Sequence, residues 1–222
     1  MIDWSRIETV FLDMDGTLLD LHFDNYFWHE YVPEQYAATH NLDVNAAKTL
    51  LFPMFQKVEG SMEWYCIDYW SRELRLDIAE LKRDIRHLIR IRPHTIEFLD
   101  FLRQSGHRLV LVTNAHSKSL SLKMEKTQLQ GHFDRLVCAH DFGVPKEDVT
   151  FWDKLKTVEA FESSATLMID DSIPVLESAK NYGIKYLLAV AWPDLKSEKR
   201  NITEFDSIHC FSEIIPDKGN AK

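Results

Sequence analysis

The sequence of 222 residues lacks several features that would indicate a specific class of protein. It has only seven glycines and no G-x-G-x-x-G fingerprint, which disfavours a dinucleotide-binding oxidoreductase. Its three cysteines, Cys66, Cys138 and Cys210, lie far apart without the spacing of zinc ligands, so we interpret them as reduced thiols. No apolar run approaches the ~18 residues of a membrane-spanning helix, and the first ten residues do not resemble a signal peptide. We therefore expect a cytoplasmic protein without a membrane partner.

Basic residues are also in deficit. The 26 Lys and Arg are outnumbered by 35 Asp and Glu, which gives a formal net charge of −9. This balance disfavours nucleic acid as a partner, because nucleic-acid binding depends on a broad basic surface. The one basic run, residues 83–92, contains an acid and is interpreted as a solvated helix face. A small anionic substrate remains compatible, since salt screens exposed charges beyond ~8 Å.

What the sequence does contain is a repeated alternation of strand and helix patterns. Continuous apolar and β-branched runs predict strands buried on both faces, at residues 9–12, 108–114, 135–140, 166–171 and 184–191. Helical patterns accompany the later strands, at residues 93–104, 117–127, 148–162 and 173–182. The prediction is an α/β protein with a Rossmann-like core, in which helices flank a central parallel sheet. The tail, residues 202–215, is predicted to form a short terminal helix.

The first and second predicted strands are unusually far apart in the sequence. A β-α-β crossover needs only a dozen or more residues, whereas this connection is several times longer. It contains helical patterns and no convincing strand, with the expected helices at residues 25–40, 44–60, 62–74 and 78–89. We predict an inserted all-helical cap subdomain over residues 18–91, and a catalytic core formed by residues 1–17 and 92–222.

Polar residues collect where the predicted strands end, and ligands of α/β sheets bind at that edge. The polar residues at these positions are Asp13, Asp15, Thr17, Thr113, Asn114, Lys146, Asp170 and Asp171. Neighbouring carboxylates repel one another unless a cation lies between them, and oxygen ligands suit Mg²⁺, with Mn²⁺ as the alternative. Such an ion and Lys146 would neutralise a phosphate group that an aspartate attacks, while Thr113 and Asn114 hold its other oxygens. The sequence therefore predicts a Mg²⁺-dependent phosphoryl-transfer site.

The four groups of site residues, D-M-D-G-T, T-N, Lys146 and the acid pair D-D, resemble the four motifs of the haloacid dehalogenase-like hydrolases in order and placement. Within that superfamily, the segments LDMDGTLLD, FDNYFW, EWYCIDYW, TNAH and FGVPKED resemble the GMP/IMP nucleotidases. This resemblance implies a helical cap, Mg²⁺, and a small phosphate ester as the substrate. The ester would be a purine nucleoside monophosphate.

The resemblance also implies roles for individual residues. Asp13 would be the nucleophile, and Asp15 the general acid and base. The metal would bind a side-chain oxygen of Asp13, the backbone carbonyl of Asp15 and, directly, Asp171. Asp170 would act on the metal through water or from a position just outside it. Lys146 would neutralise the transferred phosphoryl group.

Aromatic residues are concentrated in the insertion, and two interpretations of them stay open. Purines stack well on aromatic faces, so Asp24, Asn25, Trp64 and Tyr65 are candidates for a base-binding pocket. The other interpretation is that aromatics at helical spacing form the small core of the insertion itself.

Two alternative functions also remain. The same catalytic residues would serve a phosphatase or mutase that acts on sugar phosphates or phosphoglycolate. An Asp phosphoacceptor signalling domain is the alternative from another class. It fits less well, because such domains are about half this length, have no helical insertion and lack a second Asp like Asp15. The oligomeric state does not follow from the sequence.

Overall fold

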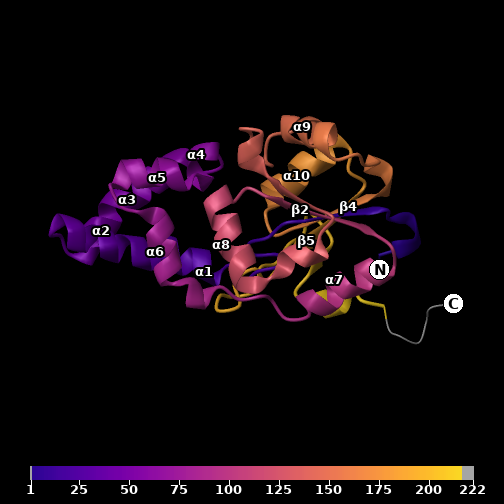
Figure 1. The fold of residues 1–222 in the computed structure, drawn as a ribbon, viewed down its shortest axis with the longest axis horizontal. Helices are drawn as coiled ribbons and strands as arrows, with labels where there is room; N and C mark the ends of the chain where they lie inside the picture. The colour runs from indigo at the N-terminus through magenta and orange to yellow at the C-terminus, as the bar shows by residue number, and fades with distance from the viewer. Residues whose placement is uncertain (1, 217–222) are drawn as a thin grey trace.

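The computed structural model describes residues 2–216, and in these residues a six-stranded sheet has the order β3-β2-β1-β4-β5-β6 (Figure 1). All neighbouring strands are parallel. The strands are β1 (Thr9–Leu12), β2 (Arg108–Thr113), β3 (Arg135–Cys138), β4 (Thr166–Asp170), β5 (Tyr186–Val190) and β6 (Ser207–Ile208). The predicted α/β class is confirmed. Because β1 lies between β2 and β4, the carboxyl ends of these three strands meet at one edge.

Helices cover both faces of the sheet, which explains why its central strands read as continuous apolar runs. Val10 of β1 pairs with Leu109 and Leu167 and faces one core cluster, whereas Phe11 faces the other. The first cluster contains the buried faces of α7 (Thr95–Gln104) and α8 (Ser117–Thr127). The second contains those of α9 (Thr150–Val158) and α10 (Ile173–Tyr182). In Figure 1, α9 and α10 lie on the opposite side of the sheet from α7.

The long connection between β1 and β2 forms an all-helical subdomain beside the core (Figure 1), as the sequence predicts. Its elements are α1 (His22–Tyr26), the π-helical segment η2 (Phe27–Tyr31), α2 (Val32–His40), α3 (Val44–Val58), α4 (Met62–Tyr65), α5 (Ile67–Leu74), α6 (Ile78–Asp84) and the 3₁₀ turn η3 (Arg86–Leu88). The single helix predicted over residues 62–74 is broken at Cys66. The backbone of Cys66 is extended, and its sulfur accepts the Tyr69 N–H at 3.4 Å to cap α5.

The two segments that join this insertion to the core are bonded to each other. Leu19 and Ile91 form an antiparallel bridge, with hydrogen bonds from Asp20 N to Arg90 O at 2.9 Å and from Arg92 N to Leu18 O at 3.0 Å. The paired segments lie beside the domain boundaries that the sequence suggests, which stay a prediction.

The helix predicted for the tail is wrong. Residues 202–215 instead contain β6 and the 3₁₀ turn η7 (Phe211–Glu213). Ile208 and Phe211 are three residues apart, as on a helical face, and both are buried. The backbone along β5 decides the outcome, because Ala189 N donates to Asp206 O and Ala191 N to Ile208 O, both at 2.8 Å. When the tail pairs with β5, it satisfies backbone groups at the sheet edge that would stay unpaired if the tail formed a helix.

Candidate active site

The loop after β1 brings two acids and a glycine to the edge of the sheet. Asp13 continues the strand, and its N–H donates to Ile169 O of β4 at 3.0 Å. Gly16 has φ +86°, and a Cβ on it would lie 2.6 Å from Cγ of Asp171. A side chain at this position would therefore collide with the acid of the neighbouring loop. Glycine allows the two acidic loops to approach each other closely.

Lys146 lies among the acids as their main counter-charge. Its Nζ is 2.6 Å from Oδ1 of Asp13 and 2.7 Å from Oδ2 of Asp170, and it also donates to Val112 O at 3.1 Å. The side chain is only 2% exposed. Burial lowers the pKa of Lys146, but the two carboxylates outweigh burial and raise it above its usual value. Lys146 is thus a fixed cation at the position that the sequence assigns to phosphate neutralisation.

Three carboxylates at this edge could hold a metal ion. One oxygen each of Asp13, Asp170 and Asp171 lies within 4.8 Å of the others. Burial, reinforced by mutual repulsion, raises the pKa of Asp13 and of Asp171 to about 7 and that of Asp170 to about 6. Lys146 and the partly exposed Arg200, whose guanidinium lies 3.4 Å from Asp171, do not compensate all three acids. A set of three carboxylate oxygens with unmet negative charge fits a hard divalent cation such as Mg²⁺.

These raised pKa values predict how stability depends on pH and metal. Each of the three acids has a folded pKa above its unfolded value of 3.8, so the folded state binds more protons between about pH 4 and 7. In EDTA, the free energy of unfolding should therefore fall as pH rises through this range. A divalent cation removes the repulsion only when the acids are ionised. We expect Mg²⁺ to raise the Tm at pH 8 by about 2–4 °C for each kcal/mol of binding free energy, and far less at pH 5. Thermal melts with Mg²⁺ or EDTA at both pH values test this, and an equal gain at both would contradict it.

Further polar groups line the same pocket. Oδ1 of Asn114 accepts the Lys146 N–H at 2.9 Å, and its Nδ2 donates to Glu147 at 2.8 Å. The hydroxyl of Tyr65, in the insertion, donates to the other oxygen of Glu147 at 2.5 Å. Thr113 Oγ1 accepts the Ala115 N–H at 3.0 Å. Glu147 thus links the insertion to the core, a role that sequence reasoning missed although the residue directly follows Lys146.

Thr17 is placed differently from the other predicted substrate contacts. Its side chain is fully buried, and it is not part of the wall of the cavity that the other site residues line. Its hydroxyl has no hydrogen-bond partner among the described residues. The structure therefore gives Thr17 a place beneath the site, without direct access to a ligand in the cavity.

A second buried charge network, which the sequence did not predict, surrounds Asp15. Lys123 of α8 places its Nζ 2.7 Å from Asp15 and 2.7 Å from Asp24 of α1. Lys82 of α6 lies 2.8 Å from the other oxygen of Asp24. Burial raises the pKa of Asp15, an effect that Lys123 opposes. Burial also acts on Asp24, but the two ammonium groups outweigh it and lower its pKa to about 2. This network connects the predicted general acid and base to two helices of the insertion.

Aromatic rings line the network on the insertion side. The Lys82 ammonium lies 4.4 Å from the centre of the Phe27 ring and 5.0 Å from that of Phe23, within the range of cation–π attraction. Buried lysines are rare unless they are paired in this way. The sequence contains only a weak indication that Lys123 is buried. The residue lies between the apolar Leu122 and Met124, on the buried side of an amphipathic helix.

The candidate base pocket is only partly open to a ligand. Both oxygens of Asp24 are bonded to lysines, and Asn25 donates its side-chain N–H to Asp194 at 2.8 Å. All four candidates line the cavity, Trp64 and Tyr65 included. Trp70 packs edge-on against Phe55, 5.0 Å between ring centres, so part of the aromatic content forms the core of the insertion.

The acids, Lys146 and the insertion enclose one cavity of about 580 Å³. The core contributes its charged floor, and Trp28, Trp64 and Tyr65 contribute an aromatic wall. This volume lies within the usual range for small-molecule sites, about 300–1,000 Å³. A ligand with an anionic group at the charged floor and a flat ring against the aromatic wall would match this division of polar and apolar surface.

Comparison with known proteins agrees with the fold and the site. Residues 10–189 match the family described as haloacid dehalogenase-like hydrolase. The chain belongs to this family. The hydrolase is 39% identical over 215 residues to "GMP/IMP nucleotidase YrfG" of Escherichia coli, covering 97% of each chain. It is 24% identical over 192 residues to "Phosphorylated carbohydrates phosphatase" of Thermotoga maritima, covering 83% of this chain and 85% of the other.

A solved structure agrees with the fold of this hydrolase. The HAD phosphatase of Thermococcus onnurineus superimposes with a TM-score of 0.78 at 20% identity, covering 93% of this chain and 95% of the other. In residues 2–216, no helix combines the length and the apolar character needed to cross a membrane.

Proposed function

We propose that this hydrolase is a Mg²⁺-dependent phosphatase that cleaves the purine nucleoside 5′-monophosphates GMP and IMP to nucleoside and phosphate. The observation that carries the proposal is the buried Lys146, bonded to Asp13 and Asp170 at the floor of a cavity with an aromatic wall. The 39% identity to a curated GMP/IMP nucleotidase over nearly the whole chain supports the choice of substrate.

In the proposed mechanism, an oxygen of Asp13 attacks phosphorus and the bond from phosphorus to the ribose oxygen breaks. Asp15 gives its proton to the departing oxygen, which leaves as the nucleoside hydroxyl. Asp15 then takes a proton from a water molecule that attacks the aspartyl phosphate, so phosphate departs and Asp13 is regenerated. Lys146 stabilises the charge on the phosphoryl oxygens throughout. A cation held by Asp13, Asp170 and Asp171 would supply further neutralisation of that charge.

The surroundings of Asp15 suit both directions of proton transfer. Burial favours its protonated form, whereas Lys123 at 2.7 Å favours its carboxylate. A group held between these opposing influences can give up a proton and recover it. We propose that residues 18–91 act as a cap over this chemistry, excluding water from the cavity and reading the leaving group through Trp64 and Tyr65.

The test of the proposed function is a phosphatase screen with and without EDTA. Substrates should include GMP, IMP, AMP, the pyrimidine monophosphates, sugar phosphates and phosphoglycolate. We expect GMP and IMP to have the highest kcat/KM and EDTA to remove activity on every substrate. A sugar phosphate at the top of the profile would favour the second candidate, a sugar-phosphate phosphatase, which the 24% identity to the Thermotoga maritima enzyme supports.

Trp64→Ala should raise the KM for GMP selectively. Base–aromatic stacking contributes on the order of 1–3 kcal/mol, so a loss of about tenfold in apparent affinity is expected for GMP. The KM for ribose 5-phosphate, which has no aromatic ring, should change by less than about twofold. Tyr36→Ala is the matched control, because Tyr36 lies in the insertion and stacks on His40 away from the cavity. Equal effects of Trp64→Ala on both substrates would remove Trp64 from base recognition.

A further inference from the structure

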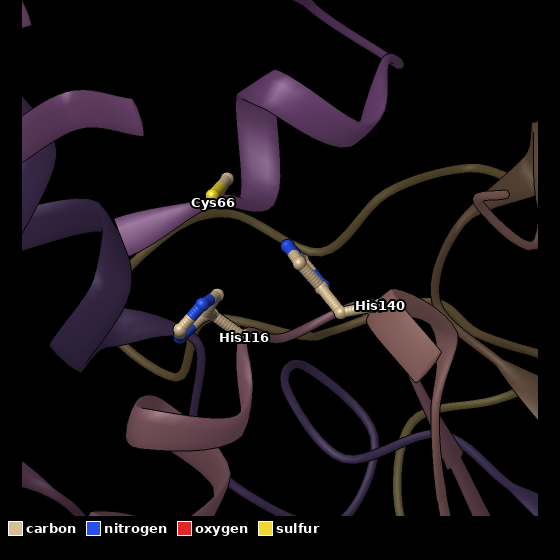
Figure 2. A group of neighbouring side chains, drawn as sticks. All are labelled: Cys66, His116 and His140. Atoms are coloured by element: carbon tan, nitrogen blue, oxygen red, sulfur yellow. The ribbon is translucent and has the colours of Figure 1, made fainter. Parts of the chain in front are cut away.

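Three side chains of metal-ligand type meet outside the catalytic site, where the insertion contacts the core. Cys66 precedes α5 in the insertion, His116 precedes α8, and His140 lies in the 3₁₀ turn η5 (Ala139–Asp141) after β3. The sulfur and one nitrogen of each ring all lie within 4.8 Å of one another. Figure 2 shows the three side chains gathered around a common space from three separate segments. The three residues form no recognisable metal-binding motif in the sequence, because Cys66 and His116 are 50 residues apart and His116 and His140 are 24 apart.

The imidazole of His140 lacks hydrogen-bond partners among the residues that the structure describes. Both of its ring nitrogens are buried and lack a hydrogen-bond partner among residues 2–216. Among residues 2–216, His107 and His132 each have one buried ring nitrogen without a partner, and His140 is the one histidine with two. A buried imidazole without any partner is costly, and such groups call for a specific explanation. A bound cation would supply the missing interaction.

Cys66 and His116 make only weak contacts, which a bound metal could replace or retain. The sulfur of Cys66 accepts the Tyr69 N–H at 3.4 Å. Nδ1 of His116 accepts the Lys118 N–H at 3.3 Å, and its Nε2 lies 3.7 Å from Asp68. A carboxylate beside a ligating histidine is a common outer partner in metal sites, since it fixes the tautomer of the ring. Burial lowers the pKa of both imidazoles, that of His140 to about 4, so both rings are neutral at pH 7.

We propose that Cys66, His116 and His140 form a site for a borderline metal ion, Zn²⁺, which fastens the insertion to the core. One thiolate and two imidazoles are the donors that Zn²⁺ prefers, whereas Mg²⁺ prefers the oxygens of the catalytic acids. In a tetrahedral site the donor atoms would be about 3.5 Å apart, so the three groups need to close by roughly 1 Å. Water would take the fourth position.

Binding at this site has a mechanical consequence. Cys66 belongs to the insertion, whereas His116 and His140 belong to two core loops, so a shared ion would hold the insertion against the core. His116 lies two residues after Asn114, which contacts Lys146 in the catalytic site. A bound ion should therefore slow the opening of the cavity and lower kcat.

The experiment uses the full-length chain, stripped with chelator and then held in excess Mg²⁺ to saturate the catalytic acids. Co²⁺ replaces Zn²⁺ as a spectroscopic probe, because only a thiolate ligand produces a sulfur-to-cobalt charge-transfer absorption. We expect this absorption, together with one equivalent of tightly held Zn²⁺, in the wild type and in Cys210→Ser. Cys210 is a matched control, since its sulfur lies beside Pro93 O, outside the cluster. Cys66→Ser and His140→Ala should lose the absorption or bind at least tenfold more weakly.

A second measurement does not depend on variants. Zn²⁺ should slow the alkylation of Cys66 in the wild type, as measured by mass spectrometry of the labelled peptide, and leave the alkylation of Cys210 unchanged. Two results would overturn the proposal: the absence of a charge-transfer absorption in the wild type, or equal alkylation of Cys66 with and without Zn²⁺. Zinc bound only by the catalytic acids would give both of these negative results.

Discussion

Asp13→Asn is expected to lower kcat for GMP by on the order of 10⁴-fold while the protein remains folded. An amide is not a nucleophile towards phosphorus, so the phosphoenzyme cannot form. The side-chain oxygen of Asn can still accept the hydrogen bond that Lys146 now gives to Asp13 at 2.6 Å. Because burial raises the pKa of Asp13 to about 7, ionised Asp13 is poorly solvated. The neutral variant should therefore melt no lower than the wild type in EDTA at pH 8.

Two measurements together decide this prediction. Steady-state kinetics with GMP gives the loss of turnover, and circular dichroism during heating shows whether the fold is retained. Asp100→Asn is the control, since Asp100 is an exposed acid on α7, and its substitution should leave kcat within about twofold. Retention of a tenth or more of the wild-type kcat by Asp13→Asn would show that another group attacks phosphorus.

Lys123→Met is expected to damage both stability and turnover. The substitution keeps a long side chain but leaves the partly buried acids Asp15 and Asp24 with Lys82 as the one remaining lysine of the network. Removing one member of a buried charge network commonly costs about 3–5 kcal/mol, because the partner charge is left uncompensated. We also expect kcat for GMP to fall about 100-fold and KM to change little, since Lys123 orients Asp15 and does not line the floor that holds phosphate.

The design includes a same-helix control and a compensating change. Lys126→Met alters an exposed lysine of α8 and should leave both Tm and kcat close to wild type. Adding Asp24→Asn to Lys123→Met removes one of the uncompensated acids and should restore much of the lost stability, whereas kcat should remain low. If the double variant were as unstable as the sum of the single ones, the acids and Lys123 would not act as one network.

The sequence predicted the floor of the site because a simple geometric rule governs it. Parallel strands end at a shared edge, so residues after β1, β2, β3 and β4 had to come together there. The structure brings Asp13, Lys146 and Asp170 into direct contact at this edge, as expected. The class of the fold followed from the same alternation of strands and helices. These predictions depended only on local patterns and on the order of the elements.

The parts that the sequence did not predict depend on how separate elements pack together. A lysine on a helix is normally solvated, and the apolar neighbours Leu122 and Met124 are the only local difference between Lys123 and Lys126. Its burial arises because α8, α1 and α6 converge on Asp24. The same reason applies to His140, which meets Cys66 only after the insertion has packed on the core. The tail was mispredicted because a free sheet edge, not its own periodicity, determined its structure.

The paired connection between insertion and core limits how the cavity can be opened. Leu19 and Ile91 belong to opposite ends of the insertion, yet they bond to each other beside the core. Because backbone hydrogen bonds join these two crossings, we expect them to move together and the insertion to swing about them as one unit.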